Sequence, residues 1–139
     1  MQFKYDTRYT QDYGFEMVPR VSVVFRNPKN GRELPIFCLV DSGASETLIN
    51  REIAEGLGIE VERGKLRQFG GIGGNVVGYE HTITMRLVGD IHEFTIMCSA
   101  LALPSYDGLL GQRGFFDNYK VVFEKYKKRF EVTAQQKKA

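Results

Sequence analysis

Short runs in which apolar and polar residues alternate make up most of the chain beyond residue 17. Runs of this period, broken by glycine, proline and asparagine, are typical of short strands joined by turns. One such turn is expected at residues 27–31. The predicted strands span residues 18–25, 34–40, 66–69, 76–79, 82–88, 92–101, 121–123 and 129–132. The pattern therefore predicts a mostly β fold.

One segment keeps helical rather than strand-like spacing. Residues 47–58 carry apolar side chains at positions 48, 49, 53 and 57, and glycines at positions 56 and 58 close the segment. This spacing would place the apolar side chains on one face of a helix. A second, shorter helix is expected near residues 114–117. The pattern thus predicts one or two short helices beside the strands.

The length of 139 residues fits one domain, which we expect to span residues 1–132. Residues 133–139 are polar and are expected to form a disordered tail. The fractions of hydrophobic (42%) and charged (26%) residues are ordinary for a globular protein. The apolar runs are too short to span a bilayer, and the polar N-terminal residues lack a signal-peptide core. We therefore expect a soluble, cytoplasmic protein with no membrane partner.

Charge and metal-ligating residues argue against several classes of function. The 19 basic and 17 acidic residues leave a net charge of +2, which is too small to indicate binding to nucleic acid. The basic run at residues 125–129 is interpreted as a solvated turn. Cys38 and Cys98 lie in apolar runs and are expected to be small buried side chains. His81 and His92 have no partners at ligand spacing, so no metal site is expected.

The clearest candidate for chemistry is Asp41, which follows the apolar run at residues 36–40 and precedes Ser42 and Gly43. A carboxylate at the end of a buried strand is costly, because removing its charge from water takes roughly several kcal/mol unless hydrogen bonds or proton sharing compensate. Gly43 would let backbone amides approach the carboxylate, and the Ser42 hydroxyl could donate across an interface. The alternative is that Asp41 only caps a turn or a helix.

Residues 39–45, Leu-Val-Asp-Ser-Gly-Ala-Ser, resemble the active-site signature of retropepsin-like aspartic proteases: two hydrophobic residues, Asp, Thr or Ser, Gly, and Ala or Ser. Residues 108–111, Gly-Leu-Leu-Gly, resemble the loop that crosses beneath the catalytic loop in this family and leads into its helix. The glycine-rich segment 70–74 resembles the flap. These elements follow the family's order within residues 18–132. The resemblance implies an all-β, closed-barrel-like acid protease fold.

The resemblance also implies an aspartic endopeptidase that hydrolyses polypeptides without a cofactor. Pepsin-like enzymes carry two Asp motifs in one chain, whereas this chain has one, so a homodimer is implied in which each copy supplies Asp41. The two carboxylates would hold one proton between them at mildly acidic pH. The ionised one would take a proton from a bridging water, while the other donates to the scissile carbonyl oxygen. The implied catalytic residues are Asp41, Ser42 and Gly43.

The implied substrate-binding residues lie beside the acid and in the flap-like segment. They are Ala44, Phe69, Gly70, Gly71, Ile72, Gly73 and Gly74. Ile72, at the centre of the segment, is the residue expected to contact substrate most directly. The alternative interpretation of the segment is a mobile hairpin without a binding role.

Two other kinds of site have little support in the sequence. Residues 71–74 lack the strand-to-helix context of a phosphate-binding loop, and Ser45 lacks the setting of a serine nucleophile. The main alternative is a non-catalytic module of the same fold that binds a peptide or a protein. A weakly dimerising chain would show activity that rises with its concentration. Which termini complete the dimer interface stays open, because retroviral members interleave their ends and other branches do not.

Overall fold

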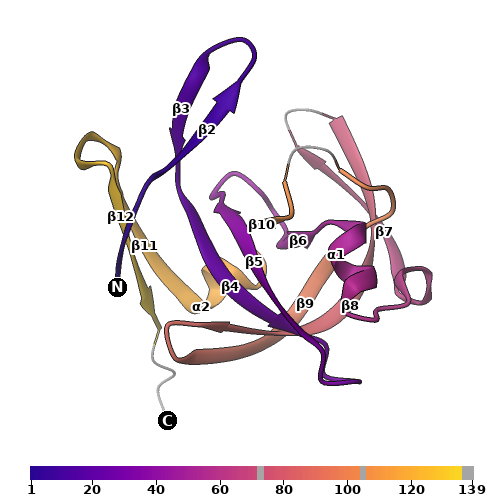
Figure 1. The fold of residues 1–139 in the computed structure, drawn as a ribbon. Helices are drawn as coiled ribbons and strands as arrows, with labels where there is room; N and C mark the ends of the chain where they lie inside the picture. The colour runs from indigo at the N-terminus through magenta and orange to yellow at the C-terminus, as the bar shows by residue number, and fades with distance from the viewer. Residues whose placement is uncertain (72–73, 104–105, 136–139) are drawn as a thin grey trace.

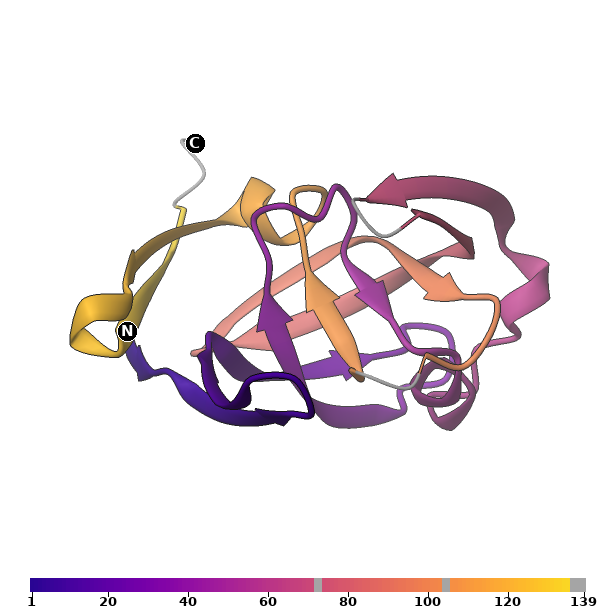
Figure 2. The same ribbon diagram turned by 90° about the horizontal axis from the view of Figure 1, so that it is seen from above.

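The computed structural model describes residues 1–71, 74–103 and 106–135, with the backbone alone for residues 69–71, 74 and 75. Within this part of the chain, six strands close into a barrel in the order β4, β5, β10, β6, β9 and β8, and β8 returns to β4 (Figures 1 and 2). A further strand, β7, extends the sheet beyond β8. The bounds are β4 Arg20–Arg26, β5 Glu33–Val40, β6 Leu48–Ile49, β7 Lys65–Gly71, β8 Gly74–Leu87, β9 Asp90–Ser99 and β10 Gly108–Leu110.

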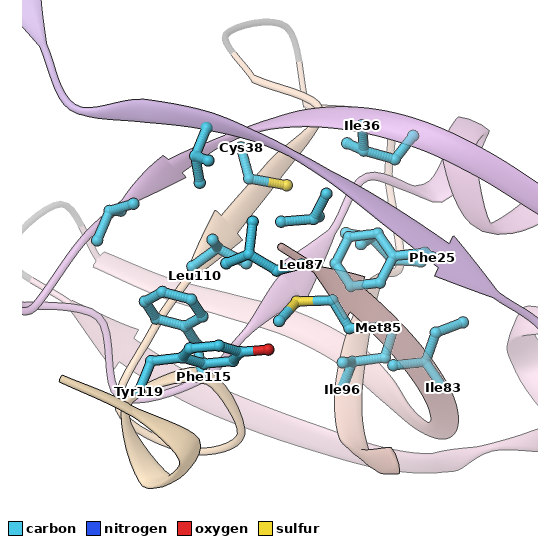
Figure 3. Close-up of a cluster of buried hydrophobic side chains, with 14 of the residues drawn as sticks. Phe25, Ile36, Cys38, Ile83, Met85, Leu87, Ile96, Leu110, Phe115 and Tyr119 are labelled. Carbon is cyan, nitrogen blue, oxygen red and sulfur yellow. The ribbon is translucent and has the colours of Figure 1, made fainter. Parts of the chain in front are cut away.

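The period-two pattern explains how the barrel is filled. In β4, Val21, Val23 and Phe25 are buried, because alternate side chains of a strand share one face. In β5 the buried positions are 36, 38 and 40. Figure 3 shows these side chains meeting those of β8, β9 and β10 in one cluster, whose labelled members are Phe25, Ile36, Cys38, Ile83, Met85, Leu87, Ile96, Leu110, Phe115 and Tyr119. The predicted burial of both cysteines is confirmed: Cys38 and Cys98 lie in the core.

Two smaller sheets lie outside the barrel. The terminal sheet has the order β1 (Gln2–Lys4), β12 (Arg129–Ala134) and β11 (Tyr119–Glu124), so the two ends of the chain pair with each other. The second sheet is the hairpin of β2 (Asp6–Thr10) and β3 (Gly14–Val18), which projects beyond the barrel (Figure 1). Short helices complete the described chain: α1 Arg51–Gly56, η1 Val61–Arg63, α2 Phe115–Asn118 and η2 Lys125–Lys127. In the described residues no helix is long and apolar enough to cross a membrane.

The predicted helix at residues 47–58 was wrong in its first third. Leu48 and Ile49 form β6, which pairs with β9 on one side and β10 on the other. The backbone of this stretch is bound elsewhere, since Thr47 accepts from the Met97 N–H at 2.9 Å and the Asn50 N–H donates to Asp107 at 2.9 Å. Pairing within the barrel therefore overrides helical spacing until α1 begins at Arg51.

The ends of the chain also differ from the sequence-based expectation. The strands β1, β2 and β3 were not predicted, because residues 2–18 show no sustained alternation of apolar and polar side chains. At the other end, β12 continues through Thr133 and Ala134, which pair with Lys120 and Tyr119, two residues past the expected start of the tail. Ala134 extends the strand's inward-facing row, which explains the extra pairing. Residues 136–139 lie outside the described residues, so the disordered tail stays a prediction.

Candidate active site

Asp41 lies at the end of β5, where the strand leaves the barrel. Its backbone N–H donates to the Leu110 carbonyl of β10 at 2.9 Å, and β5 and β10 run parallel with Val40 beside Leu110. On the opposite side, the Val40 N–H donates to the Pro19 carbonyl at 2.8 Å. The backbone that carries the acid is therefore fixed by two neighbouring segments, while its side chain is only half-buried.

The residues after Asp41 fold back around its carboxylate. The Gly43 N–H donates to Asp41 Oδ1 at 3.0 Å, and the Ala44 N–H donates to the Asp41 carbonyl at 3.1 Å. A Cβ atom at position 43 would lie 3.3 Å from Oδ1, which is a tight contact. Glycine at this position therefore lets the backbone lie close to the carboxylate. Within the described residues this is the one hydrogen bond to the carboxylate, and Ser42 and Gly43 are exposed. The acid is thus oriented but open to further partners.

The segment after β10 passes beneath this loop and holds it. The Gln112 N–H donates to the Ala44 carbonyl at 2.8 Å, and Gln112 Nε2 donates to the Ser42 carbonyl at 2.7 Å. The Arg113 N–H donates to the Ser45 carbonyl at 3.0 Å. The fit is close, because a Cβ atom at Gly111 would lie 2.1 Å from the Glu46 carbonyl. Gln112 therefore supports the acid-bearing loop, a role that no sequence motif indicates apart from its place after Gly111.

Thr47 joins the two loops from inside the barrel. Its fully buried hydroxyl donates to the Arg113 carbonyl at 2.8 Å and accepts from the Gly111 N–H at 3.2 Å and the Phe115 N–H at 3.4 Å. These bonds satisfy backbone groups that would otherwise be buried without a partner. Sequence reasoning missed this residue because it assigned position 47 to a helix.

The predicted flap is a hairpin of β7 and β8. Its register pairs Phe69 with Val76, Gly70 with Asn75 and Gly71 with Gly74. Both ribbon views place the ends of these strands on the same side of the barrel as the loop after β5 (Figures 1 and 2). Ile72 and Gly73 lie outside the described residues. The structure therefore brings the described ends of β7 and β8 and the Asp41 loop to one side of the barrel. The contacts of residues 69–74 with substrate stay a prediction.

Glu46 introduces a second carboxylate at the edge of the site. Its side chain is nine-tenths buried, and Oε1 lies 3.5 Å from the Arg113 Nε. Burial raises the pKa of Glu46, which Arg113 opposes; Glu80 of β8 raises it further and Arg67 of β7 lowers it. The pKa of Glu46 therefore depends in part on two charged residues at the base of the flap-like hairpin. No sequence motif indicated this dependence.

The closed barrel, the Asp-Ser-Gly loop at its edge and the segment crossing beneath define the retropepsin-like aspartic protease fold. The structure is similar to a retropepsin-like aspartic protease from Rickettsia conorii, with a TM-score of 0.60 and 17% identity over 96% of this chain and 98% of that one. It is also similar to the EIAV protease complexed with the inhibitor HBY-793, with a TM-score of 0.51 and 21% identity over 68% of this chain and 82% of that one.

The model of the gag-polyprotein putative aspartyl protease family matches residues 29–115, more than half of the sequence, and the chain belongs to this family. No curated protein matches the sequence. The family and the fold class predicted from residues 39–45, 70–74 and 108–111 are confirmed. The roles of the individual site residues stay predictions.

Proposed function

We propose that this chain is an aspartic endopeptidase that acts as a homodimer, in which the Asp41 side chains of two copies activate one water molecule. The observation that carries the proposal is the geometry of Asp41. Its backbone is fixed by Leu110, its carboxylate is oriented by the Gly43 N–H, and the loop around it is exposed. Such a carboxylate is positioned for proton transfer and is accessible to a second molecule.

The dimer follows from the chemistry that peptide hydrolysis requires. One group must accept a proton from water while another donates a proton to the carbonyl oxygen, and a lone carboxylate cannot be in both states at once. The chain carries one Asp-Ser-Gly motif. A two-fold axis beside Asp41 would supply the second acid from a copy of the same chain. The exposed Ser42 hydroxyl would then be free to donate to the loop of the partner copy.

In the proposed reaction the ionised carboxylate removes a proton from water, and the water oxygen forms a bond to the scissile carbonyl carbon. The protonated carboxylate gives its proton to the carbonyl oxygen, which yields a tetrahedral diol. The carbon–nitrogen bond then breaks as the nitrogen takes the proton first removed from water. A diol hydroxyl returns its proton to the other carboxylate, so both acids regain their starting states. No covalent intermediate and no cofactor enter this sequence.

Cleavage of casein across pH 3 to 8 tests the proposal. Asp41→Asn keeps the hydrogen-bonding shape of the side chain but cannot exchange a proton, so cleavage should fall by at least about 100-fold. Asp90→Asn, at the exposed first residue of β9, is the matched control and should cleave like the wild type. Equal cleavage by the Asp41 variant would refute the assignment. A folded wild-type dimer that binds casein without cutting it would favour the non-catalytic binding module.

A further inference from the structure

The hairpin of β2 and β3 presents an aromatic face that nothing in the described chain covers. Tyr9 and Phe15 are cross-strand partners whose rings meet edge to face at 5.5 Å, and they are 66% and 77% exposed. Tyr13, in the turn between the strands, is 83% exposed. The two strands pair with each other and with no other described strand. An isolated two-stranded hairpin is only marginally stable in water, so this one is suited to packing against another surface.

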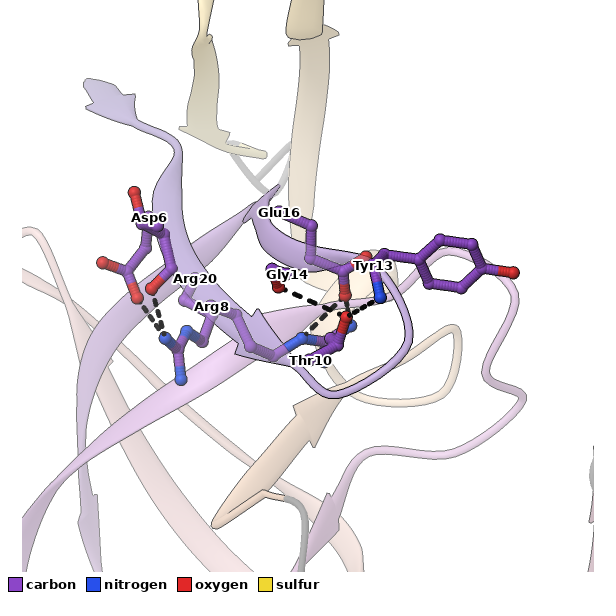
Figure 4. A network of polar contacts seen from close by, with 8 residues as sticks. Asp6, Arg8, Thr10, Tyr13, Gly14, Glu16 and Arg20 are labelled. Atoms are coloured by element: carbon purple, nitrogen blue, oxygen red, sulfur yellow. Dashed lines mark hydrogen bonds and ion pairs between the residues drawn. The ribbon is translucent and has the colours of Figure 1, made fainter.

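The opposite face of the hairpin is polar and carries ion pairs within the chain. Arg8 pairs with Glu16 across the strands, with Arg8 Nε donating at 3.0 Å. Arg20 pairs with Asp6 at the base, and the Thr10 hydroxyl donates to the Gly14 carbonyl and accepts from the Tyr13 N–H across the turn (Figure 4). In Figure 4 the Tyr13 ring points away from this network. The hairpin is therefore two-sided, with a fixed polar face and a free aromatic face.

The hairpin is rooted beside the catalytic loop. Pro19, the residue after β3, accepts the hydrogen bond from the Val40 N–H, and Val40 directly precedes Asp41. The guanidinium of Arg20 lies 5.0 Å from the centre of the Phe37 ring on β5, which fixes the same junction. Phe15 lies four residues from Pro19, or about 13 Å along an extended strand. The aromatic face thus begins within about 13 Å of the backbone that holds Val40, the residue before Asp41.

We propose that the aromatic face formed by Tyr9 and Phe15, together with the exposed Tyr13 at the turn, packs against the partner copy in the active dimer. The inference rests on the proposed function, since it assumes that a second copy completes the site. The terminal strands β1 and β12 pair within one chain, so their mutual hydrogen bonds do not join two copies. The three aromatic side chains would bury roughly 300–500 Å². A stable dimer needs about 800 Å² per partner, so this face would supply about half of the contact.

Sedimentation equilibrium of a double variant, Tyr9→Thr with Phe15→Thr, tests this inference without reference to activity. Threonine keeps the strand preference while removing both rings. The dimer dissociation constant should rise at least about tenfold, the equivalent of 1.4 kcal/mol. The control is Tyr126→Thr, which removes a ring that is 80% exposed in η2 of the terminal hairpin and should leave the constant unchanged. An unchanged constant in the double variant overturns the inference.

Cleavage measured in parallel separates this inference from the proposed function. If the hairpin joins the copies, the double variant should regain wild-type turnover per dimer at high protein concentration. A normal dissociation constant with a raised KM would assign the aromatic face to substrate instead and overturn the inference. If the double substitution raises the dimer dissociation constant but the wild-type dimer cuts no peptide, the proposed function alone would be contradicted.

A labelling experiment covers the case in which the double variant does not fold. Cys38 and Cys98 are buried, so Tyr13→Cys would add one accessible thiol at the turn of the hairpin. We expect this thiol to react several-fold more slowly at concentrations where the protein is dimeric than where it is monomeric. Equal rates in both states would overturn the inference.

Discussion

At the scale of single residues, the site contains two acids in different surroundings. Asp41 is oriented but accessible, whereas Glu46 is buried. Asp41 receives the Gly43 N–H and remains open to a partner. Glu46 lies nine-tenths buried five residues later, with Arg113 as its ion-pair partner. The two carboxylates thus have different environments: Asp41 is half-buried, and the Glu46 side chain is almost fully buried. The second should affect stability in a way that depends on pH.

Replacing Glu46 by Gln should stabilise the protein relative to wild type by an amount that grows as the pH rises from 4 to 7. Burial raises the pKa of Glu46 in the folded state, so wild type loses stability once the pH exceeds the unfolded value. Urea unfolding of both proteins at several pH values measures the difference. A stability difference that stays constant or shrinks with rising pH would contradict a raised pKa of Glu46 in the folded state.

Glu62→Gln is the matched control and should show the opposite sign. The hydrogen bond from Arg51 lowers the pKa of Glu62, so wild type gains stability as the pH rises above the folded value. Gln cannot ionise, and the variant should therefore become less stable relative to wild type between pH 4 and 7. If the stability differences of the two variants from wild type change with pH in opposite directions, then the local burial and ion pairing of each Glu determine the pH dependence. A change in net charge alone would affect both variants in the same direction.

At the scale of elements, the acid-bearing loop depends on two strands that are only two and three residues long, β6 and β10. β10 runs parallel to β5 and antiparallel to β6, so it bridges the two ends of the loop. The buried hydroxyl of Thr47 then ties this loop to the start of α2. The position of Asp41 therefore depends on backbone bonds from several elements.

Thr47→Val should lower the free energy of unfolding by about 1–3 kcal/mol. Valine has nearly the same shape, but it leaves the N–H groups of Gly111 and Phe115 and the Arg113 carbonyl buried without this partner. Chemical denaturation measures the loss. The control, Thr133→Val on the exposed face of β12, should change stability by less than about 0.5 kcal/mol. Equal stability of the two variants would show that Thr47 does not hold the loops together.

The sequence predicts the barrel strands well because their buried residues alternate regularly, as at positions 21, 23 and 25. The sequence-based prediction fails where strand pairing within the barrel overrides the local pattern of apolar residues. Leu48 and Ile49 have helical spacing but both are buried between β9 and β10. The hairpin of β2 and β3 escapes prediction because residues 2–18 show no sustained alternation of apolar and polar side chains. The residues around Asp41 form a contiguous motif that can be recognised in the sequence. The supporting contacts of Gln112 and Thr47 join segments that are far apart in the chain, so the sequence alone does not reveal them.

At the scale of the whole molecule, the chain forms a closed barrel with one Asp-Ser-Gly loop at its edge. The acid, the flap-like hairpin and the root of the β2–β3 hairpin all lie near the end of β5 (Figure 1). The proposed dimer would place a second set of these elements across a two-fold axis, which accounts for the exposed catalytic loop and for the uncovered aromatic face. The cytoplasmic location and the polypeptide substrate stay predictions on this account.

Mixing wild type with Asp41→Asn at constant total protein tests the shared site most directly. If each active site needs one Asp41 from each copy, an equal mixture that has exchanged subunits should keep about one quarter of the wild-type activity. About half of the dimers are then mixed and about a quarter carry two variant copies, and both kinds are inactive. If each chain works alone, the mixture should keep about half. A quadratic decline of activity with the wild-type fraction is the predicted result, and a linear decline would contradict the homodimeric active site.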